Sequence, residues 1–260
     1  MSSSTPTTEI QVFTQEIDTL EGGNGRDTFT LRNNSDQLQI LLFNPPVTAA
    51  GTPQDNELLG TMRNDAIYGR RGDDTLSGFR GDDFVDGETG DDLMFAGRGD
   101  DGLVGDAGND TMFGDRGADT LYGNNDADVL FGNAESDVLY GDAGDDSLYG
   151  GQGNDTLVGG SDSDFLSGDR GDDILSGISR PNLGYTRIAD FNRNEDTLLL
   201  PGNENLYSLT ATNELDNTPD SFPRGTAILA VNEADGSQQL IAVIEGVTNF
   251  DLAQSYVEFI

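Results

Sequence analysis

Aspartate recurs at every ninth residue over the middle of this chain, without a break. The set is Asp65, Asp74, Asp83, Asp92, Asp101, Asp110, Asp119, Asp128, Asp137, Asp146, Asp155, Asp164 and Asp173. Carboxylates can transfer protons in catalysis, or they can bind hard cations through their oxygens. Nothing in the sequence distinguishes one pair of these aspartates from its copies. The repetition therefore favours cation binding over a catalytic pair.

The chain has too little positive charge to neutralise these aspartates. Its 260 residues include 48 acidic and 13 basic side chains, which gives a formal net charge of −35. Two carboxylates about 5 Å apart repel by roughly 3 kcal/mol at an effective dielectric of about 20. A stack of such groups would oppose folding. We therefore predict that a bound cation is part of the structure.

Each aspartate belongs to a nine-residue unit, and the units run from Gly60 to Ser176 without insertion or deletion. Aspartate is position 6, position 8 is always apolar, and position 1 is glycine in every unit except at Ala96. Position 4 is glycine in nine units: Gly72, Gly81, Gly90, Gly99, Gly108, Gly117, Gly144, Gly153 and Gly171. The other position-4 residues are Arg63, Asp126, Glu135 and Asp162.

This period predicts a β-solenoid rather than a helix, because glycine-dense units are poor helix formers. Positions 7 to 9 alternate as a very short strand with one inward side chain, and the glycines form the turns. Two units then complete one coil, so residues 18 apart stack at the parallel-strand spacing of about 4.8 Å. The aspartates would form two columns, one along each edge of the solenoid.

The absent residue types narrow the choice of cation. The chain contains no histidine and no cysteine, so imidazole and thiolate ligands are excluded, as are Ser-His-Asp and Cys-His catalytic sites. Carboxylate and carbonyl oxygens are hard ligands. Ca²⁺ accepts six to eight oxygens in flexible geometry, whereas Mg²⁺ tends to keep its water. We predict several bound Ca²⁺ ions.

Two segments, GGQGNDTLV (150–158) and GGNGRDTFT (22–30), match the pattern G-G-x-G-x-D-x-apolar-x at every position. This unit resembles the RTX nonapeptide, the hemolysin-type calcium-binding repeat. The resemblance implies a right-handed parallel β-roll with Ca²⁺ held between turns. Its ligands would be the position-6 aspartates, Asp27 of the earlier match, and carbonyls of the loops with glycine at position 4. Whether the loops with another residue at position 4 bind metal stays open.

The resemblance also implies a location and a transport route. Family members are secreted unfolded by Gram-negative bacteria through a type I apparatus, and they fold when they meet extracellular calcium. We therefore expect an extracellular or cell-surface protein with the secretion machinery as a partner. The terminal residues VEFI (257–260) fit either an uncleaved secretion signal or an edge strand. The start, MSSSTPTTEIQVFTQ, predicts no cleavable signal.

Other partners are excluded by charge and hydropathy. The acidic excess predicts no nucleic-acid binding, which requires a basic surface, and anionic membrane surfaces would repel the chain. No run of about 18 apolar residues predicts a transmembrane segment.

We predict an all-β chain with three parts. Residues 1–50 form an N-terminal cap with imperfect repeats, whose frame slips by two before Gly60. Residues 51–180 form the parallel β-roll, and residues 181–260 form a small antiparallel β cap. In that cap, segments 225–231 and 238–247 predict a hairpin. Asp190 and Asp196 fit either a last ion site or turns that end strands.

The function predicted from these features is a secreted, non-enzymatic calcium-binding protein, since no catalytic motif is present. The alternative is an adhesin or surface component that binds a glycan or itself. That alternative rests on outward aromatic residues at position 9: Phe95, Phe113, Phe131 and Tyr149. Arg80, Arg98 and Arg116 also stack, and they could meet an anionic polysaccharide or bridge neighbouring aspartates. A third hypothesis is an accessory module of a secreted hydrolase.

Overall fold

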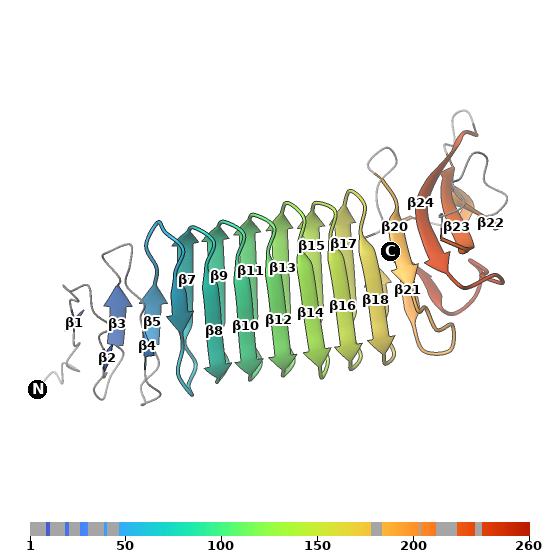
Figure 1. The fold of residues 1–260 in the computed structure, drawn as a ribbon. Helices are drawn as coiled ribbons and strands as arrows, with labels where there is room; N and C mark the ends of the chain where they lie inside the picture. The colour runs from blue at the N-terminus through green and yellow to red at the C-terminus, as the bar shows by residue number, and fades with distance from the viewer. Residues whose placement is uncertain are drawn as a thin grey trace, which may run out of the picture.

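The structure is a computed structural model, and it shows an all-β roll of two facing parallel sheets (Figure 1). It describes residues 9–10, 19–20, 27–30, 39–40, 47–177, 184–202, 204–211, 223–231 and 236–260. The chain alternates between the two sheets, one strand at a time, along most of its length. This arrangement confirms the predicted parallel β-roll.

One sheet consists of strands that alternate with those of the other. Its order is β1 (Glu9–Ile10), β3 (Asp27–Thr30), β5 (Val47–Ala50), β7 (Ala66–Arg71), β9 (Phe84–Thr89), β11 (Gly102–Ala107), β13 (Thr120–Asn125), β15 (Val138–Ala143), β17 (Thr156–Ser161), β19 (Ile174–Ser176), β21 (Thr197–Leu200) and β25 (Val257–Phe259). We call it the odd sheet.

The even sheet faces it. Its order is β6 (Glu57–Leu59), β8 (Thr75–Arg80), β10 (Leu93–Arg98), β12 (Thr111–Arg116), β14 (Val129–Ala134), β16 (Ser147–Gln152), β18 (Phe165–Arg170), β20 (Thr186–Ala189), β24 (Gln238–Glu245), β23 (Gly225–Val231) and β22 (Tyr207–Ala211). Two further strands pair with each other, β2 (Thr19–Leu20) and β4 (Gln39–Ile40). A short 3-10 helix, Glu204–Leu206, precedes β22.

The core is a ladder of the position-8 side chains, as the period predicts. Neighbouring strands pair in register 18 residues apart, so that Met112 lies between Met94 and Leu130. These residues have no exposed surface, and the same holds for every position-8 residue from Ile67 to Leu175. Each strand contributes one such side chain to the dry space between the sheets. Burial of a leucine-sized side chain contributes roughly 1.5–3 kcal/mol.

The strands are longer than the predicted three residues, and this prediction was wrong. From β7 to β18 each strand has six residues and covers positions 7, 8, 9, 1, 2 and 3, as in Ser147–Gln152. Position 2 takes a positive φ, as at Asp115 (69°), yet still pairs with the neighbouring strands. The left-handed residue bends the strand without ending it, which leaves only positions 4 to 6 for the turn.

The roll begins before the first unit that the sequence reveals. Leu58 occupies position 8 of a unit at 51–59 and has no exposed surface. Its position 6 is Asn56, whose backbone N–H donates to Asp74 Oδ1 at 2.6 Å. Farther back, Phe29 pairs with Ala49, 20 residues on, whereas Ala49 pairs with Ile67, 18 residues on. The two-residue slip is therefore confirmed, and the sheet accommodates it.

The C-terminal residues extend both sheets rather than forming a separate layer (Figure 1). The predicted hairpin forms as antiparallel β23 and β24, with β22 on its outer side. Strand β24 also pairs in parallel with β20, and β25 pairs in parallel with β21. The cap thus continues the hydrogen-bond ladders of the roll and covers its open end, which a solenoid requires.

Candidate metal-binding turns

The turns bring the position-6 aspartates into two columns along the edges of the roll. Their side chains are nearly inaccessible, with 1–5% exposure from Asp65 to Asp173. One carboxylate oxygen, Oδ1, accepts a hydrogen bond from the backbone N–H of the position-6 residue 18 positions earlier. These N···O distances lie between 2.6 and 3.3 Å. The ladder fixes the orientation of each carboxylate.

The second oxygen, Oδ2, is buried and has no hydrogen-bond partner in most of these aspartates. The set is Asp74, Asp83, Asp92, Asp101, Asp110, Asp119, Asp128, Asp137, Asp146, Asp155 and Asp164. Buried polar atoms in native proteins are nearly always paired, because an unpaired one costs the full desolvation penalty of the group. A column of orphaned carboxylate oxygens is what a bound cation would satisfy.

Burial is the main perturbation of these carboxylates. Desolvation raises the pKa of Asp119, Asp128 and Asp164 to about 8, and that of Asp101 and Asp110 to about 6. Like charges in neighbouring coils raise the pKa further, but they are the smaller cause. The sequence argument therefore named a real but secondary cost. Removal from water dominates, and a cation offsets both.

Glycine at position 1 lets this carboxylate lie close to the next coil. A Cβ added at Gly114 would lie 2.5 Å from Asp119 Oδ2 and 2.9 Å from the carbonyl oxygen of Gly132. When the carboxyl is ionised, both atoms are acceptors, so neither can hydrogen-bond to the other. A carboxylate beside a carbonyl is the donor set that Ca²⁺ prefers. The same arrangement recurs at Gly69, beside Asp74 and Gly87.

Acidic side chains alone do not complete a site. Among the described residues, no three acidic side chains converge closely enough to hold one ion. A cation in these turns would therefore also take backbone carbonyls, in accord with the predicted contribution of the loops. The donor set fits Ca²⁺, because its six to eight oxygens can include carbonyls as readily as carboxylates.

Position 4 packs against the turn of the preceding coil. A Cβ at Gly72 would lie 2.5 Å from the carbonyl carbon of Gln54, one coil earlier. The nine position-4 glycines have φ between 103° and 150°. Asp126, Glu135 and Asp162 instead adopt φ of 73°, 83° and 76°. These three turns thus differ in conformation from the glycine turns, and a left-handed non-glycine residue costs about 1–2 kcal/mol.

The first turns differ from the interior ones in how Oδ2 is satisfied. Asp65 Oδ2 accepts from the backbone N–H of Thr61 at 2.5 Å and from its hydroxyl at 2.9 Å. Thr61 is position 2 of that unit. From Arg70 onward every position-2 residue has a positive φ, and in those units Oδ2 loses this donor. The unpaired Oδ2 atoms thus occur in the units whose position-2 residue has a positive φ. No residue type in the sequence predicts that conformation.

A second ladder on the turn surface was missed by sequence reasoning. Position-5 side chains accept from the backbone N–H of position 5 one coil later, as Asp82 does from Asp100 at 3.2 Å. Asp91 accepts from Asn109 at 2.8 Å in the same way. This ladder runs opposite to the position-6 ladder. Its signal in the sequence is the Asp, Asn and Ser residues that recur at position 5.

Three predicted aspartates lie outside the thirteen consecutive repeat units. Asp196 Oδ1 accepts from the N–H of Asp173 at 3.2 Å, and its Oδ2 accepts from the N–H of Asn192 at 2.7 Å. Asp190 Oδ2 accepts from the N–H of Asp169 and the hydroxyl of Ser167. Both carboxylates thus have donors from the protein. The side chain of Asp27 lies outside the described part of the chain.

Comparison with known proteins identifies the repeat. The sequence profile of the RTX calcium-binding nonapeptide repeat, in four copies, matches residues 14–38, 59–94, 86–121, 122–157 and 149–177. These segments make up more than half of the chain. The chain belongs to the RTX family. Its RTX repeats include all thirteen position-6 aspartates of the roll, and the first matched segment includes Asp27.

A solved structure is also similar to part of this chain. It is the solution structure of a subunit of the mannuronan C5-epimerase from Azotobacter vinelandii, with 24% identity and a TM-score of 0.34. The match covers 51% of this chain and 82% of the other. No curated protein matches the chain.

Proposed function

We propose that this RTX protein is a secreted, non-enzymatic calcium-binding protein whose roll folds as Ca²⁺ binds between its turns. The observation that carries the proposal is the set of eleven buried Oδ2 atoms without a hydrogen-bond partner. In solution without metal each of these atoms opposes folding. Bound Ca²⁺ supplies positive charge and empty coordination positions to oxygens that the protein leaves unpaired.

The protein residues prepare this binding in two ways. The N–H ladder on Oδ1 holds each carboxylate in place, as between Asp101 and Asp119 at 2.8 Å. Burial at the inner side of the turn excludes the water that would otherwise solvate Oδ2. Since these turns form only when coils stack, the unfolded chain has no preformed site. Binding free energy is then also folding free energy.

The proposed ligands are the position-6 aspartates together with carbonyls of the loops that have glycine at position 4. Turns with Asp126, Glu135 or Asp162 at position 4 have a different backbone conformation. We expect them to bind calcium more weakly than the glycine turns. Asp65 already accepts two hydrogen bonds from Thr61, so its turn would depend least on the ion.

A calcium titration tests the proposal. Circular dichroism should show β-structure appearing as Ca²⁺ is added after chelation, and calorimetry should report several ions per chain. Asp119→Asn removes one orphaned oxygen while keeping the shape of the side chain. It should raise the calcium midpoint and lower the number of bound ions.

Asp142→Asn is the matched control, because Asp142 is exposed and lies at position 2 rather than position 6. It should change neither the midpoint nor the stoichiometry. A chelated protein with the same spectrum and the same hydrogen-exchange protection as the calcium-loaded protein would overturn the proposal.

The proposed route to the outside is type I secretion. Low calcium inside the cell would leave the acidic chain unfolded and competent for export, and calcium outside would fold it. Within the part of the chain that the structure describes, no helix has the length and apolarity to span a bilayer. Export by a reconstituted type I system, with and without residues 257–260, tests the proposed C-terminal signal. Unchanged export of the shortened chain would remove it.

A second candidate function is that of an adhesin or surface component. A specific observation favours it: a row of arginines lies on the outer face of one sheet of an otherwise acidic roll. Self-association would appear in light scattering as a calcium-dependent increase in mass, and binding to a glycan would appear in calorimetry.

A further inference from the structure

Arginines gather on the outer face of the even sheet, along position 3. Four of its strands carry an arginine there: Arg80 in β8, Arg98 in β10, Arg116 in β12 and Arg170 in β18. Register places the first three side by side in adjacent coils. At position 3 of the odd sheet, only Arg71 is basic among the strands from β7 to β17. Four of the seven arginines in the repeat units thus lie on this face.

These guanidinium groups have no acidic partner. Among the described residues, the ion pair that the structure contains is Arg187 with Glu245, in the cap. The prediction that Arg80, Arg98 and Arg116 bridge neighbouring aspartates was therefore wrong. All three side chains are exposed, and so is Arg170. Stacked like charges repel, and no ion pair offsets this repulsion within the row.

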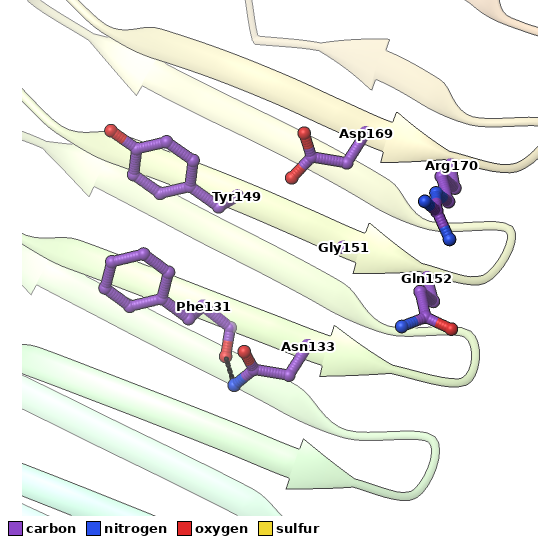
Figure 2. Close-up of a pocket in the computed structure, with 7 residues that line it drawn as sticks. All are labelled: Phe131, Asn133, Tyr149, Gly151, Gln152, Asp169 and Arg170. Atoms are coloured by element: carbon purple, nitrogen blue, oxygen red, sulfur yellow. Dashed lines mark hydrogen bonds between the residues drawn. The ribbon is translucent and has the colours of Figure 1, made fainter.

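Two shallow hollows lie beside the arginine row. One, of about 480 Å³, has Phe95, Gly97, Arg98, Asp115 and Arg116 among its lining residues. The other, of about 420 Å³, is bordered by Tyr149, Gly151, Gln152, Asp169 and Arg170. Figure 2 shows the second one, with the two rings of Phe131 and Tyr149 on one side and Gln152 and Arg170 on the other.

A glycine at position 2 lines each hollow. In the even sheet that position holds Phe79, Gly97, Asp115, Asn133, Gly151 and Asp169. A side chain is absent only at the two glycines, and each of them lines one of the hollows. They are three coils apart, which corresponds to about 14 Å along the roll. Both open on the same face, so one extended ligand can cross both.

The aromatic residues on this face limit what can bind. Phe95, Phe113, Phe131 and Tyr149 stack on one another with centroid separations of 4.9–5.1 Å and nearly parallel planes. Within this ladder the ring faces contact each other, so their edges border the hollows. A neutral sugar would bind by stacking on an aromatic ring face, and most ring faces in this ladder are covered by the neighbouring ring. The polar groups that remain available are guanidiniums and amides, together with the carboxylates of Asp115 and Asp169.

We propose that this face of the even sheet, from Arg80 to Arg170, binds a linear acidic polysaccharide. Guanidinium groups bind carboxylates through two parallel charge-assisted hydrogen bonds, which fix orientation as well as adding affinity. Asn133 and Gln152 offer amides to hydroxyl groups between these charges. A polymer with a charge on each unit matches the three guanidiniums that repeat in successive coils from Arg80 to Arg116. The inference concerns the folded roll and does not depend on how many turns bind calcium.

A calorimetric binding experiment in saturating calcium tests this inference. The probe is a short, soluble oligogalacturonate, and its fully methyl-esterified form is the uncharged control. The acid form should bind and the ester should not. Arg98→Gln combined with Arg116→Gln should weaken binding about tenfold or more, because each substitution removes a charge-assisted contact.

Arg71→Gln is the matched control on the odd sheet, and it should leave the affinity unchanged. Ala134→Arg adds a guanidinium at position 3 of β14, next to Arg116, and should strengthen binding several-fold. A gain of affinity cannot result from misfolding, which keeps the test sharp. Circular dichroism checks that each variant keeps its calcium-dependent fold.

Several results would overturn the inference. Equal binding of acid and ester would show that charge is not recognised. Binding that the double arginine variant retains in full would place the site elsewhere, for instance at calcium bridges in the turns. Light scattering that reports self-association, with no binding of the acid oligomer, would assign this face to a second copy of the chain.

Discussion

The interior turns of the roll differ from those at its two ends in how they satisfy their carboxylates. At the N-terminal end Thr61 donates its backbone N–H to Asp65 Oδ2, and at the C-terminal end Asn192 donates to Asp196 Oδ2. The residue four positions before Asp119 is Asp115, whose φ is 69°, and Asp119 Oδ2 has no donor. At the two ends the chain itself supplies a donor to Oδ2, whereas the interior turns leave Oδ2 for a bound cation.

This difference teaches which parts of the molecule depend on metal. A turn that pairs both carboxylate oxygens can persist without a cation. A turn that leaves one oxygen buried and unpaired carries a cost of about 1–3 kcal/mol or more in its absence. Because the interior turns are stacked, their costs accumulate along the roll. Calcium dependence should therefore be strongest between Asp74 and Asp164.

The largest expected effect is the loss of hydrogen-exchange protection when calcium is removed. We expect amides of the interior turns to exchange nearly freely in chelator, because their carboxylates lose their only partner for Oδ2. The hairpin β23–β24 should keep more protection, since it has its own ladder and a core that includes Ile228 and Ile244. Hydrogen-exchange mass spectrometry with and without chelator measures both regions in one sample. Uniform loss along the chain would contradict the comparison.

A second, smaller effect concerns pH in the absence of calcium. Burial raises the pKa of Asp83 and Asp128 to about 8 and that of Asp146 to about 6, against an ordinary value of 3.8. Between the ordinary pKa of 3.8 and the raised pKa of about 8, the folded roll binds more protons than the unfolded chain. Its stability therefore falls as pH rises through this range. Stability gained at pH 4 should be lost as pH passes through 6 to 8.

Circular dichroism in chelator should therefore show more β-structure at pH 5 than at pH 8. The sign reverses in subsaturating calcium, because protons compete with the ion for the same carboxylates. There, acidification from pH 8 to pH 5 should weaken calcium binding. A chelated protein that gains structure on going from pH 5 to pH 8 would contradict the burial of these groups.

Much of this architecture can be predicted from the sequence, for a physical reason. A nine-residue unit with aspartate, an apolar residue and glycines at fixed positions specifies its turn, its core contact and its register at once. The buried ladder from Ile67 to Leu175 follows directly. The unit at 51–59 was not predicted, because Asn56 stands where the other units have aspartate. Its backbone N–H nevertheless donates to Asp74, as the backbone N–H of a position-6 aspartate does.

The parts that sequence reasoning missed depend on backbone conformation and on tertiary pairing. The positive φ at position 2 is carried by residues as different as Phe79, Glu88 and Asn133, so no residue type marks it. Strand pairing continues through this residue, and Oδ2 lacks a donor in the units from Asp74 to Asp164 that contain it. The parallel docking of β24 on β20 was also missed, because alternation of apolar residues predicts a strand but not its neighbour.

Position 4 offers a third and more local test. Gly117→Ala places a methyl group against the carbonyl oxygen of Gly99 at a φ of 135°, so the turn must shift. We expect a loss of about 1–3 kcal/mol in unfolding free energy in calcium, and weaker binding in that turn. Urea unfolding and calcium calorimetry measure these two quantities.

Glu135→Gly is the reciprocal change in a turn that already has a side chain. Relief of a left-handed glutamate is worth about 1–2 kcal/mol, and the added freedom of glycine in the unfolded chain costs about 0.5–1 kcal/mol. Stability should rise by about 0–1.5 kcal/mol, while calcium affinity rises. A destabilisation as large as that of Gly117→Ala would show that the two kinds of turn do not differ as described.

The smallest expected effect lies at the C-terminal end, where one ion pair links β20 to β24. Arg187 Nη2 lies 2.6 Å from Glu245 Oε1, and the guanidinium lies over the ring of Phe165 at 5.3 Å. Because the pair is partly exposed, Arg187→Gln should cost about 1 kcal/mol or less, and the loss should shrink in high salt. Arg187→Lys, the control, keeps the charge and should retain part of the stability. Urea unfolding in saturating calcium at two salt concentrations measures it. A loss near 3 kcal/mol, insensitive to salt, would mean that this end of the roll depends on its charged pair as strongly as the interior depends on its cation.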